Sequence, residues 1–332
     1  MRSRAAGPLG TMNSWTVPAD QGGVRLDAFV RSRLPHLSLR ETQKAIKEKA
    51  FWIHDRPGRK GDRLWSGDIV AFRGRPHWLR AGPPAAWDLA VPIVYEDGFV
   101  MVLDKPAGMA THGSSGRQTK ALANFLAAVR PALCAVGKSV WEPGLVHRLD
   151  RDTSGLVLVA KNQASFEDLR AQFRHGLIKK KYWALVSGKA KREGVVSRPL
   201  ARDSGDPRRM TALLEQGGQR GRARMWKATT RFRLLGYGRG FSLLEVSTQT
   251  GVTHQIRAHL AAIGHPLAGD PLYGGEPLDP LDIGRHFLHA FYLGFRHPKS
   301  GRDVVVESPL PRELKQAVDR LGLSRAKIGD GG

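Results

Sequence analysis

The chain has 332 residues, 41% of them hydrophobic, so it can bury a large core and is not globally disordered. Its formal net charge of +23 at pH 7 indicates a polyanionic partner, because a compact body with this much like charge repels itself. Nucleic acid is the first candidate for this partner and an anionic membrane surface the second. The alternative is that the charge serves general solubility. No apolar run reaches the roughly 20 residues of a membrane span, and the single cysteine, Cys134, excludes an internal disulfide and a multi-cysteine zinc site, so we expect a cytoplasmic protein.

The first third of the chain predicts a small basic domain between two irregular segments. Residues 1–23 have no apolar signal core and no clear amphipathic period, and we expect them to be a disordered extension. Spacing and turn signals predict one helix and two strands, at 25–34, 51–53 and 69–72. Residues 74–88 contain several prolines and glycines and are expected to be a linker.

A basic helix is expected between these elements. Ser38 and Glu41 match the capping-box pattern, in which each side chain satisfies a backbone N–H group of the first turn. Along the helix that follows, Arg40, Lys44 and Lys47 recur on one face. This spacing suits contacts with successive phosphates, although an ordinary solvated face has the same pattern.

Past the linker, strands outnumber helices, which predicts an α+β fold with a mixed, largely antiparallel sheet and flanking helices over residues 89–322. Residues 93–95 and 99–103 flank a tight turn and predict a hairpin. Residues 156–160 are apolar throughout, as in a strand buried on both faces. Further strands are expected at 182–187, 226–235, 241–248, 287–293 and 304–307, helices at 121–129, 166–173 and 253–262, and a flexible tail at 323–332.

The stretch from His147 to Gly155, just before the buried strand, is the strongest candidate for chemistry. Asp150 lies between Arg148 and Arg151, and a neighbouring guanidinium keeps a carboxylate ionised in a partly dry site. Such a carboxylate can act as a nucleophile or a base. A loop salt bridge without catalytic meaning has the same appearance.

Other chemistries lack their patterns. No Gly-x-Ser-x-Gly elbow, no phosphate-cradling Gly-x-x-x-x-Gly-Lys-Ser/Thr loop and no His-Glu-x-x-His spacing is present. We therefore expect neither a metal nor a cofactor.

Residues 147–161 resemble the signature segment of the RluA-type pseudouridine synthases, which isomerise uridine to pseudouridine in RNA. Four more segments are similar to motifs of that family and follow its order: 105–108, 181–188, 253–259 and 269–274. The resemblance covers roughly residues 25–310. The domain at 24–73 in addition resembles the small RNA-binding module of the S-four type, named after a ribosomal protein.

The resemblance implies roles for individual residues. Asp150 would attack the ribose anomeric carbon or remove a neighbouring proton. Tyr182 would stack on the target uracil, with a part in removing the proton at carbon 5, and Arg257 would pair with Asp150. Arg148 would enter the space that the extracted base leaves, and with His147 it is expected to bind substrate, as are Arg40, Lys44 and Lys47.

The resemblance also bears on substrate. His112 and the residues that follow it are most similar to C-type enzymes, which modify large-subunit (23S-type) ribosomal RNA; transfer RNA and a non-catalytic ribosome-assembly factor remain alternatives. We expect a monomer. Val252 departs from the family, which usually has arginine there, and this should alter RNA contacts without abolishing chemistry. An anionic membrane as partner would need an exposed amphipathic helix with a broad apolar face, which the sequence does not contain.

Overall fold

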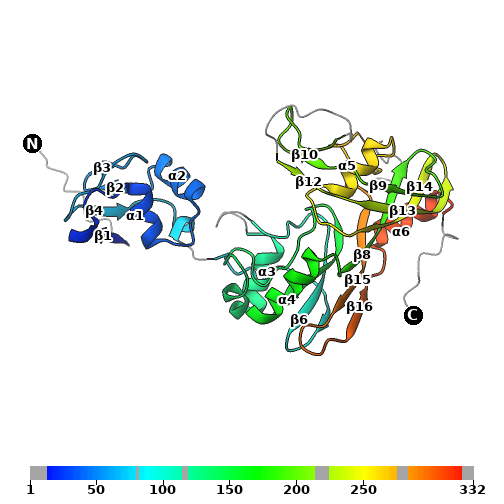
Figure 1. Cartoon of the computed structure of the whole chain (residues 1–332), viewed down its shortest axis with the longest axis horizontal. Coiled ribbons are helices and arrows are strands. Elements are labelled where there is room, and N and C mark those ends of the chain that lie inside the picture. The colour runs from blue at the N-terminus through cyan, green and yellow to red at the C-terminus, as the bar shows by residue number, and fades with distance from the viewer. Residues whose placement is uncertain (1–12, 80–81, 114–118, 214–223, 275–282, 324–332) are drawn as a thin grey trace, which may run out of the picture. The chain divides into compact units, whose positions relative to one another are not determined.

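The computed structural model describes residues 13–79, 82–113, 119–213, 224–274 and 283–323 (Figure 1). Residues up to 85 make most of one compact unit, and residues from 86 onward make most of a second, larger one. We call them the N-terminal module and the catalytic domain. The ends of the predicted disordered extension and tail, at 1–12 and 324–332, lie outside the described residues, as do residues 114–116 of the C-type segment.

Two short helices pack against a small sheet in the N-terminal module. Its strands pair antiparallel in the order β1-β4-β2-β3. The core between helices and sheet includes Phe29, Ile46, Phe51 and Val70. The elements are β1 (Ser14–Thr16), α1 (Leu26–Arg33), α2 (Leu39–Lys47), β2 (Phe51–Ile53), β3 (Arg56–Pro57) and β4 (Ile69–Phe72).

The start of α2 has the predicted capping box. The Ser38 hydroxyl accepts from the backbone N–H of Glu41 at 3.2 Å, and the Glu41 carboxylate accepts from the backbone N–H of Ser38 at 2.9 Å. Two of the orphan donors of the first turn are thereby satisfied, which stabilises a helix start by about 1 kcal/mol. The helix is thus fixed locally, and Arg40, Lys44 and Lys47 are all exposed.

The module is longer at both ends than predicted. Residues 13–23 were expected to be disordered, but Ser14–Thr16 pair with β4 and Val17 is buried in the core. Part of the predicted linker also packs here, since the 3-10 turn Pro76–Leu79 carries Trp78, which is 3% exposed. In both segments one apolar side chain gains enough from burial to order a sequence that has little local propensity of its own.

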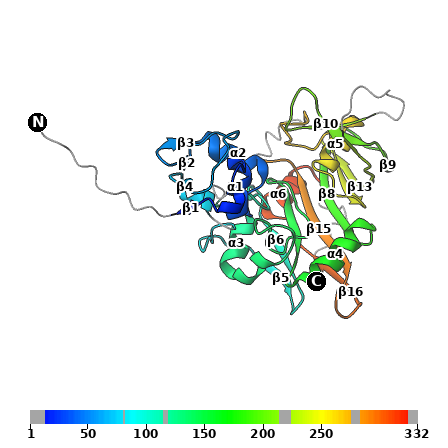
Figure 2. The same cartoon turned by 60° about the vertical axis from the view of Figure 1, so that its left-hand side comes forward.

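The catalytic domain has the predicted α+β fold. Its larger sheet joins nine strands of the described residues in the order β5-β6-β7-β15-β8-β14-β13-β9, with β16 paired to β15. Every pairing is antiparallel except that of β7 with β15. A smaller sheet has the order β11-β10-β12, and α5 lies beside it in both views (Figures 1 and 2).

The strands and helices of this domain have the following bounds: β5 (Ile93–Glu96), β6 (Val100–Lys105), α3 (Leu122–Val129), β7 (Ser154–Ala160), α4 (Gln163–Arg174), β8 (Lys179–Ser187), β9 (Glu193–Val196), β10 (Leu200–Arg202), β11 (Met210–Ala212), β12 (Met225–Trp226), β13 (Thr230–Gly238), β14 (Phe241–Thr248), α5 (Gln255–Ala262), β15 (Leu288–Arg296), β16 (Asp303–Glu307) and α6 (Arg312–Arg320).

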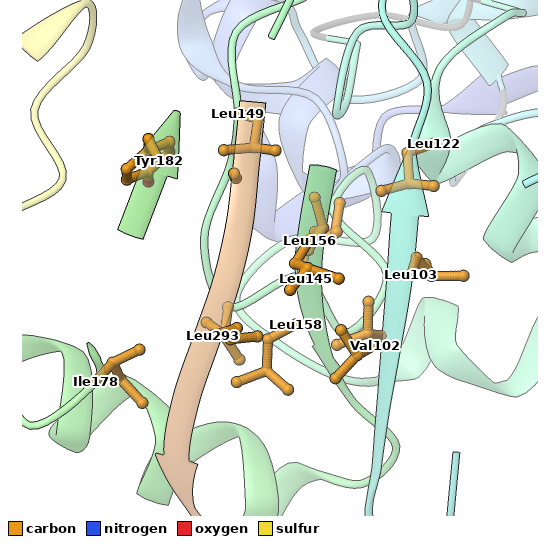
Figure 3. Close-up of a cluster of buried hydrophobic side chains, with 14 of the residues drawn as sticks. Val102, Leu103, Leu122, Leu145, Leu149, Leu156, Leu158, Ile178, Tyr182 and Leu293 are labelled. Carbon is orange, nitrogen blue, oxygen red and sulfur yellow. The ribbon is translucent and has the colours of Figure 1, made fainter. Parts of the chain in front are cut away.

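The large sheet is covered on both faces, and β8 shows this best. Its even-numbered residues Tyr182, Ala184 and Val186 belong to the core cluster that contains residues of α3 and α4. Its odd-numbered residues Trp183 and Leu185 belong to the cluster that contains residues of α6. Alternation along one strand therefore sends a side chain into each layer in turn. Figure 3 shows the first cluster, with Tyr182 and Leu149 both within it.

Strand β7 is buried at all seven positions, as its uninterrupted apolar run predicts. At its start, Gly155 has φ +114°, and a Cβ there would lie 2.3 Å from the carbonyl oxygen of Ala290. Only glycine allows β15 to approach so closely. This close contact sets the position of the segment that carries Asp150. At the other end of the domain the predicted tail begins too early, because Leu323 is buried in the α6 cluster.

Candidate active site

Asp150 lies in the loop that leads into β7, and residues distant in sequence surround it. Its Oδ2 accepts from Nη1 of Arg257, on α5, at 3.2 Å. Its side chain is 19% exposed and that of Arg257 9%. Asp150, Tyr182 and Arg257 line one pocket of about 60 Å³. The predicted pairing of Asp150 with Arg257 is therefore present, and the three residues expected to do the chemistry lie together.

A second carboxylate holds Arg257. Asp270 accepts from Nε and Nη2 of Arg257 at 2.7 and 2.8 Å, and it is completely buried. Burial alone would lower the pKa of Arg257, but the hydrogen bonds and charges of Asp270 and Asp150 raise it above its ordinary value. The two-point bond to Asp270 fixes the plane of the guanidinium and leaves Nη1 directed at Asp150.

A histidine approaches Asp150 from another direction. His254 precedes α5 with φ 54°, in the left-handed region, and its Nε2 lies 3.8 Å from Oδ2 of Asp150. Its Nδ1 lies 3.1 Å from the hydroxyl of Tyr273, which accepts from the backbone N–H of Met210 at 2.8 Å. Strained backbone at such a position is typical of functional sites.

The bonds of Tyr273 determine how His254 is protonated. The Tyr273 hydroxyl accepts from the Met210 N–H and has its own hydrogen left to donate, and Nδ1 of His254 lies within hydrogen-bond distance of it. A neutral ring with its hydrogen on Nε2 satisfies both neighbours, because Nδ1 then accepts from the Tyr273 hydroxyl and the N–H group is on the atom nearest Asp150. Burial lowers the pKa of His254, although the charge of Asp150 acts in the opposite sense. The ring is thus neutral at pH 7 and presents an N–H group toward the carboxylate.

Side chains from other segments hold almost every residue of the Asp150 loop. The Thr111 hydroxyl donates to the carbonyl of Leu149 at 2.8 Å and accepts from the Leu149 N–H at 3.1 Å. Arg285 donates to the carbonyl of Asp152 at 3.0 Å. Thr153 and Ser154 bond the buried rings of His286 and His289 at 2.8 and 2.9 Å, respectively. Such a framework keeps a reactive group in position before substrate arrives.

Lys105 stabilises this loop through hydrogen bonds to backbone carbonyls. It is fully buried, and its ammonium group donates to the carbonyls of Pro106, Met109 and Arg151 at 2.8, 2.8 and 3.0 Å. Burial lowers its pKa to about 7, against the opposing charges of Asp152 and Asp150. All three N–H groups are used on backbone carbonyls, so Lys105 ties the first motif to the Asp150 loop.

Tyr182 lies in the wall of the same pocket and is 8% exposed. Burial, with the nearby charge of Asp150, raises its pKa to about 12. The phenol therefore keeps its proton at pH 7, which favours stacking over proton removal as its expected role. Val252 also lines this pocket and packs against the cluster around Tyr273.

The expected substrate-binding residues are placed differently from one another. Arg148 lines a second pocket, next to the first, and its Nη1 lies 3.2 Å from Nε2 of His112. His147 lines that pocket too, but its Nε2 accepts from the backbone N–H of Leu158 at 2.9 Å. Burial lowers the pKa of His147 to about 3. It is thus a neutral residue of the framework, and only its Nδ1–H remains to meet a ligand.

Sequence reasoning gave no role to Asp270, Tyr273 or Lys105, although each lies in a segment that resembles a family motif. The sequence signal for Asp270 was an aspartate within an otherwise apolar turn. The partners of Lys105 are backbone carbonyls, and those of Tyr273 are a backbone N–H and the ring of His254, all pairings that no sequence pattern specifies. Within the described residues no three His, Cys, Asp or Glu side chains are grouped to hold a metal ion, and no helix has the length and apolar character to cross a membrane.

Comparison with known proteins decides the family. A family model described as RNA pseudouridylate synthase matches residues 99–262. Ribosomal large subunit pseudouridine synthase D of Nitrosomonas europaea is 35% identical over 336 aligned positions. The alignment covers 96% of this chain and 92% of that protein. The chain belongs to the RNA pseudouridylate synthase family. The resemblance inferred from the five motifs is therefore confirmed.

Other members of this family are similar over comparable lengths. Ribosomal large subunit pseudouridine synthase C of Vibrio cholerae is 32% identical, over 92% of this chain and 95% of that protein. Identity thus does not single out the C type over the D type. Among solved structures, human RNA pseudouridylate synthase domain containing 1 is 25% identical with a TM-score of 0.54, over 73% of this chain and 97% of that one. The predicted pseudouridine synthase fold is confirmed.

Proposed function

We propose that this pseudouridine synthase isomerises uridine in large-subunit ribosomal RNA, with Asp150 as its catalytic group. The observation that carries the proposal is the pocket in which Asp150, aimed by Arg257, meets Tyr182. Relatives named large subunit pseudouridine synthase C and D support ribosomal RNA as the substrate. The C- or D-type target within that RNA is left to experiment.

The site supplies what the isomerisation requires of a protein. Asp150 is held as a carboxylate that accepts from Arg257, with the N–H of His254 directed at the same oxygen. It can add to the ribose anomeric carbon, or it can remove the proton from the neighbouring ribose carbon. Addition expels the uracil as the bond to nitrogen 1 breaks, and removal of the proton expels it with formation of a ribose glycal. Carbon 5 of the uracil then bonds to the anomeric carbon, which releases Asp150 in the first route and returns the proton to the neighbouring ribose carbon in the second. Carbon 5 finally loses its hydrogen as a proton to solvent and nitrogen 1 gains one, so that substrate and product are isomers. Arg257 holds the carboxylate in one orientation before the reaction, so no reorganisation is needed when bonds change.

The target uridine must leave the base stack of the RNA, and this extrusion costs a few kcal/mol. We propose that the N-terminal module supplies part of the compensating contacts, as an S-four type module would. Arg40, Lys44 and Lys47 are exposed on α2. Lys44 and Lys47 also line a groove of about 1000 Å³, together with Lys49, Arg56, Arg59 and Lys60. The one acid in its wall, Asp62, is paired with Arg56 at 2.7 Å.

Asp150→Asn tests the proposal. The amide keeps the shape of the carboxylate but removes its charge, so pseudouridine formation in a large-subunit ribosomal RNA transcript should fall by about four orders of magnitude or more. RNA affinity should change little. Asp303→Asn, which removes the same charge at an exposed position, is the matched control and should remain active. Residual activity of Asp150→Asn above one percent would contradict the assignment.

The RNA class needs its own measurement. Pseudouridines mapped in ribosomal and transfer RNA from cells with and without the protein should differ at one or more positions of the large-subunit RNA. Differences confined to transfer RNA would overturn the substrate but keep the chemistry. No difference in either, together with retained RNA binding, would favour a non-catalytic assembly factor.

A further inference from the structure

A second pocket adjoins the active site. It has a volume of about 320 Å³, within the range of sites that hold small ligands. Gly251 lines both this pocket and the one that holds Asp150. A molecule that occupies the second pocket would therefore lie next to whatever is bound at Asp150.

The second pocket is strongly cationic. Four basic side chains line it, from three separate segments: Arg148, Arg170, Arg174 and Lys180. Glu142 is the only acid in its wall, and its Oε1 lies 3.3 Å from Nε2 of His112. Arg170 is anchored by a bond to the carbonyl of Val146 at 2.8 Å. This excess of positive charge suits an anion.

Lys180 is the most informative of the four. It is 7% exposed, yet no carboxylate of the described chain pairs with it. Its ammonium group donates to the carbonyl of Thr250 at 2.9 Å and lies 5.5 Å from the centre of the Phe173 ring. Buried lysines are rare without an ionic partner, because removing the charge from water is costly. The fold buries Lys180 despite this cost in free energy, and two of its three N–H groups are left to bind a ligand.

The spacing along β8 connects Lys180 to the reaction. Lys180 and Tyr182 are two residues apart on β8 and both are buried; the register of β8 with β14 is unbroken around Tyr182, and the bulge beside it lies in β15. Alternate residues of a strand lie about 7 Å apart. This separation is comparable with the step between neighbouring nucleotides of an extended RNA strand. A uridine stacked at Tyr182 thus places an adjacent backbone group within reach of Lys180.

We propose that the pocket lined by Arg148, Arg170, Arg174 and Lys180 binds a phosphodiester group of the RNA strand next to the flipped uridine. The inference rests on the proposed function for its choice of RNA. It adds a fixed anchor within the catalytic domain: the phosphate becomes the missing ionic partner of Lys180. Arg148 then serves as one side of a phosphate clamp.

The test compares Lys180→Met with Lys189→Met. Both remove one lysine charge, but Lys189 is exposed near the other end of β8. For binding to an unmodified transcript of large-subunit ribosomal RNA, Lys180→Met should raise Kd about tenfold or more, as expected for the loss of a charge-assisted hydrogen bond. The slope of log K against log salt should become shallower by roughly 0.7 to 0.9, one phosphate contact. Lys189→Met should match the wild type in both.

Thermal unfolding separates binding from structure. Methionine keeps the apolar stem of Lys180, so the unfolding temperature of Lys180→Met should stay unchanged or rise. A clear fall in that temperature with unchanged RNA affinity would make Lys180 a structural residue and overturn the proposal. The same holds if Lys180→Met keeps the wild-type salt slope.

An RNA with a single uncharged backbone linkage then locates the contact. Single methylphosphonate linkages are placed one at a time beside the reacting uridine in an RNA fragment. One position should weaken binding to the wild type but not to Lys180→Met, because both changes remove the same contact. Additive losses at every position would contradict the proposal. If wild-type protein forms no pseudouridine yet shows this coupling, the proposed function fails and the phosphate pocket stands.

Discussion

The Asp150 loop and helix α2 both carry basic and acidic side chains, but they hold them in opposite ways. Around Asp150 the charges are buried, paired and bonded to backbone, as with Arg257 between two aspartates. On α2 the cations Arg40, Lys44 and Lys47 are exposed, with no ion pair in the described residues. Chemistry requires groups fixed before substrate binds, whereas attraction of a polyanion requires only accessible charge. The difference predicts how each region responds to substitution and to acid.

After Asp150→Asn, the largest effect is expected from Asp270→Asn. Breaking one side of a buried pair destabilises a protein by about 3 to 5 kcal/mol, and Arg257 loses the bond that fixes its plane. We expect kcat to fall about a hundredfold even though Asp270 does not line the pocket, since small misplacement at a reacting centre has effects of this size. Turnover measured at saturating RNA, with Asp303→Asn as control, checks this. Wild-type kcat in Asp270→Asn would show that Asp150 needs no aimed partner.

The second prediction concerns acid. Burial lowers the pKa of His286 and of His289 to about 4, and that of His147 to about 3. An unfolded chain protonates these rings near pH 6.5, so below that pH it binds more protons than the folded chain. The contribution to stability is therefore present above pH 6.5 and falls as pH decreases toward 4, by about 1.6 kcal/mol per histidine between pH 6.5 and 5.

Hydrogen exchange on the full chain distinguishes the two regions. After correction for the intrinsic rate, β7 and β15 should lose protection between pH 7 and pH 5. The N-terminal module has no buried histidine in its described residues, and its peptides should keep their protection. In His289→Asn, whose amide does not titrate, about a third of the pH dependence should vanish. Equal loss in both regions would refute the assignment to these histidines.

A smaller and more general effect is expected on α2. Replacing Arg40, Lys44 and Lys47 by glutamine should make the salt slope of RNA binding shallower by roughly 2 to 3, about 0.7 to 0.9 per phosphate. Activity at saturating RNA should be unchanged. A matched triple change at the exposed residues Arg239, Lys299 and Arg302 removes the same charge from the catalytic domain. If both triples alter the slope equally, net charge rather than α2 determines the affinity.

The same contrast explains what the sequence could predict. The start of α2 is encoded within four residues, Ser38 to Glu41, and the buried strand β7 in one apolar run, so both were found. Asp150, Tyr182 and Arg257 were found because each lies in a segment that resembles a family motif. Strand β1 and the turn at Trp78 were missed, because they are ordered by burial against elements distant in the chain. For the same reason, nothing local announces that Asp270 holds Arg257 or that Tyr273 orients His254.

The pocket at Asp150 has consequences for which molecules can react there. Its volume of about 60 Å³ is about a fifth of the 320 Å³ of the neighbouring pocket, so the space beside Asp150 is narrow. A free nucleoside makes contacts only in this narrow space and lacks the further contacts that flanking nucleotides bring. A polymer that grips the protein at several points supplies them. Free uridine and its nucleotides should for this reason not react, so that the enzyme modifies RNA chains alone.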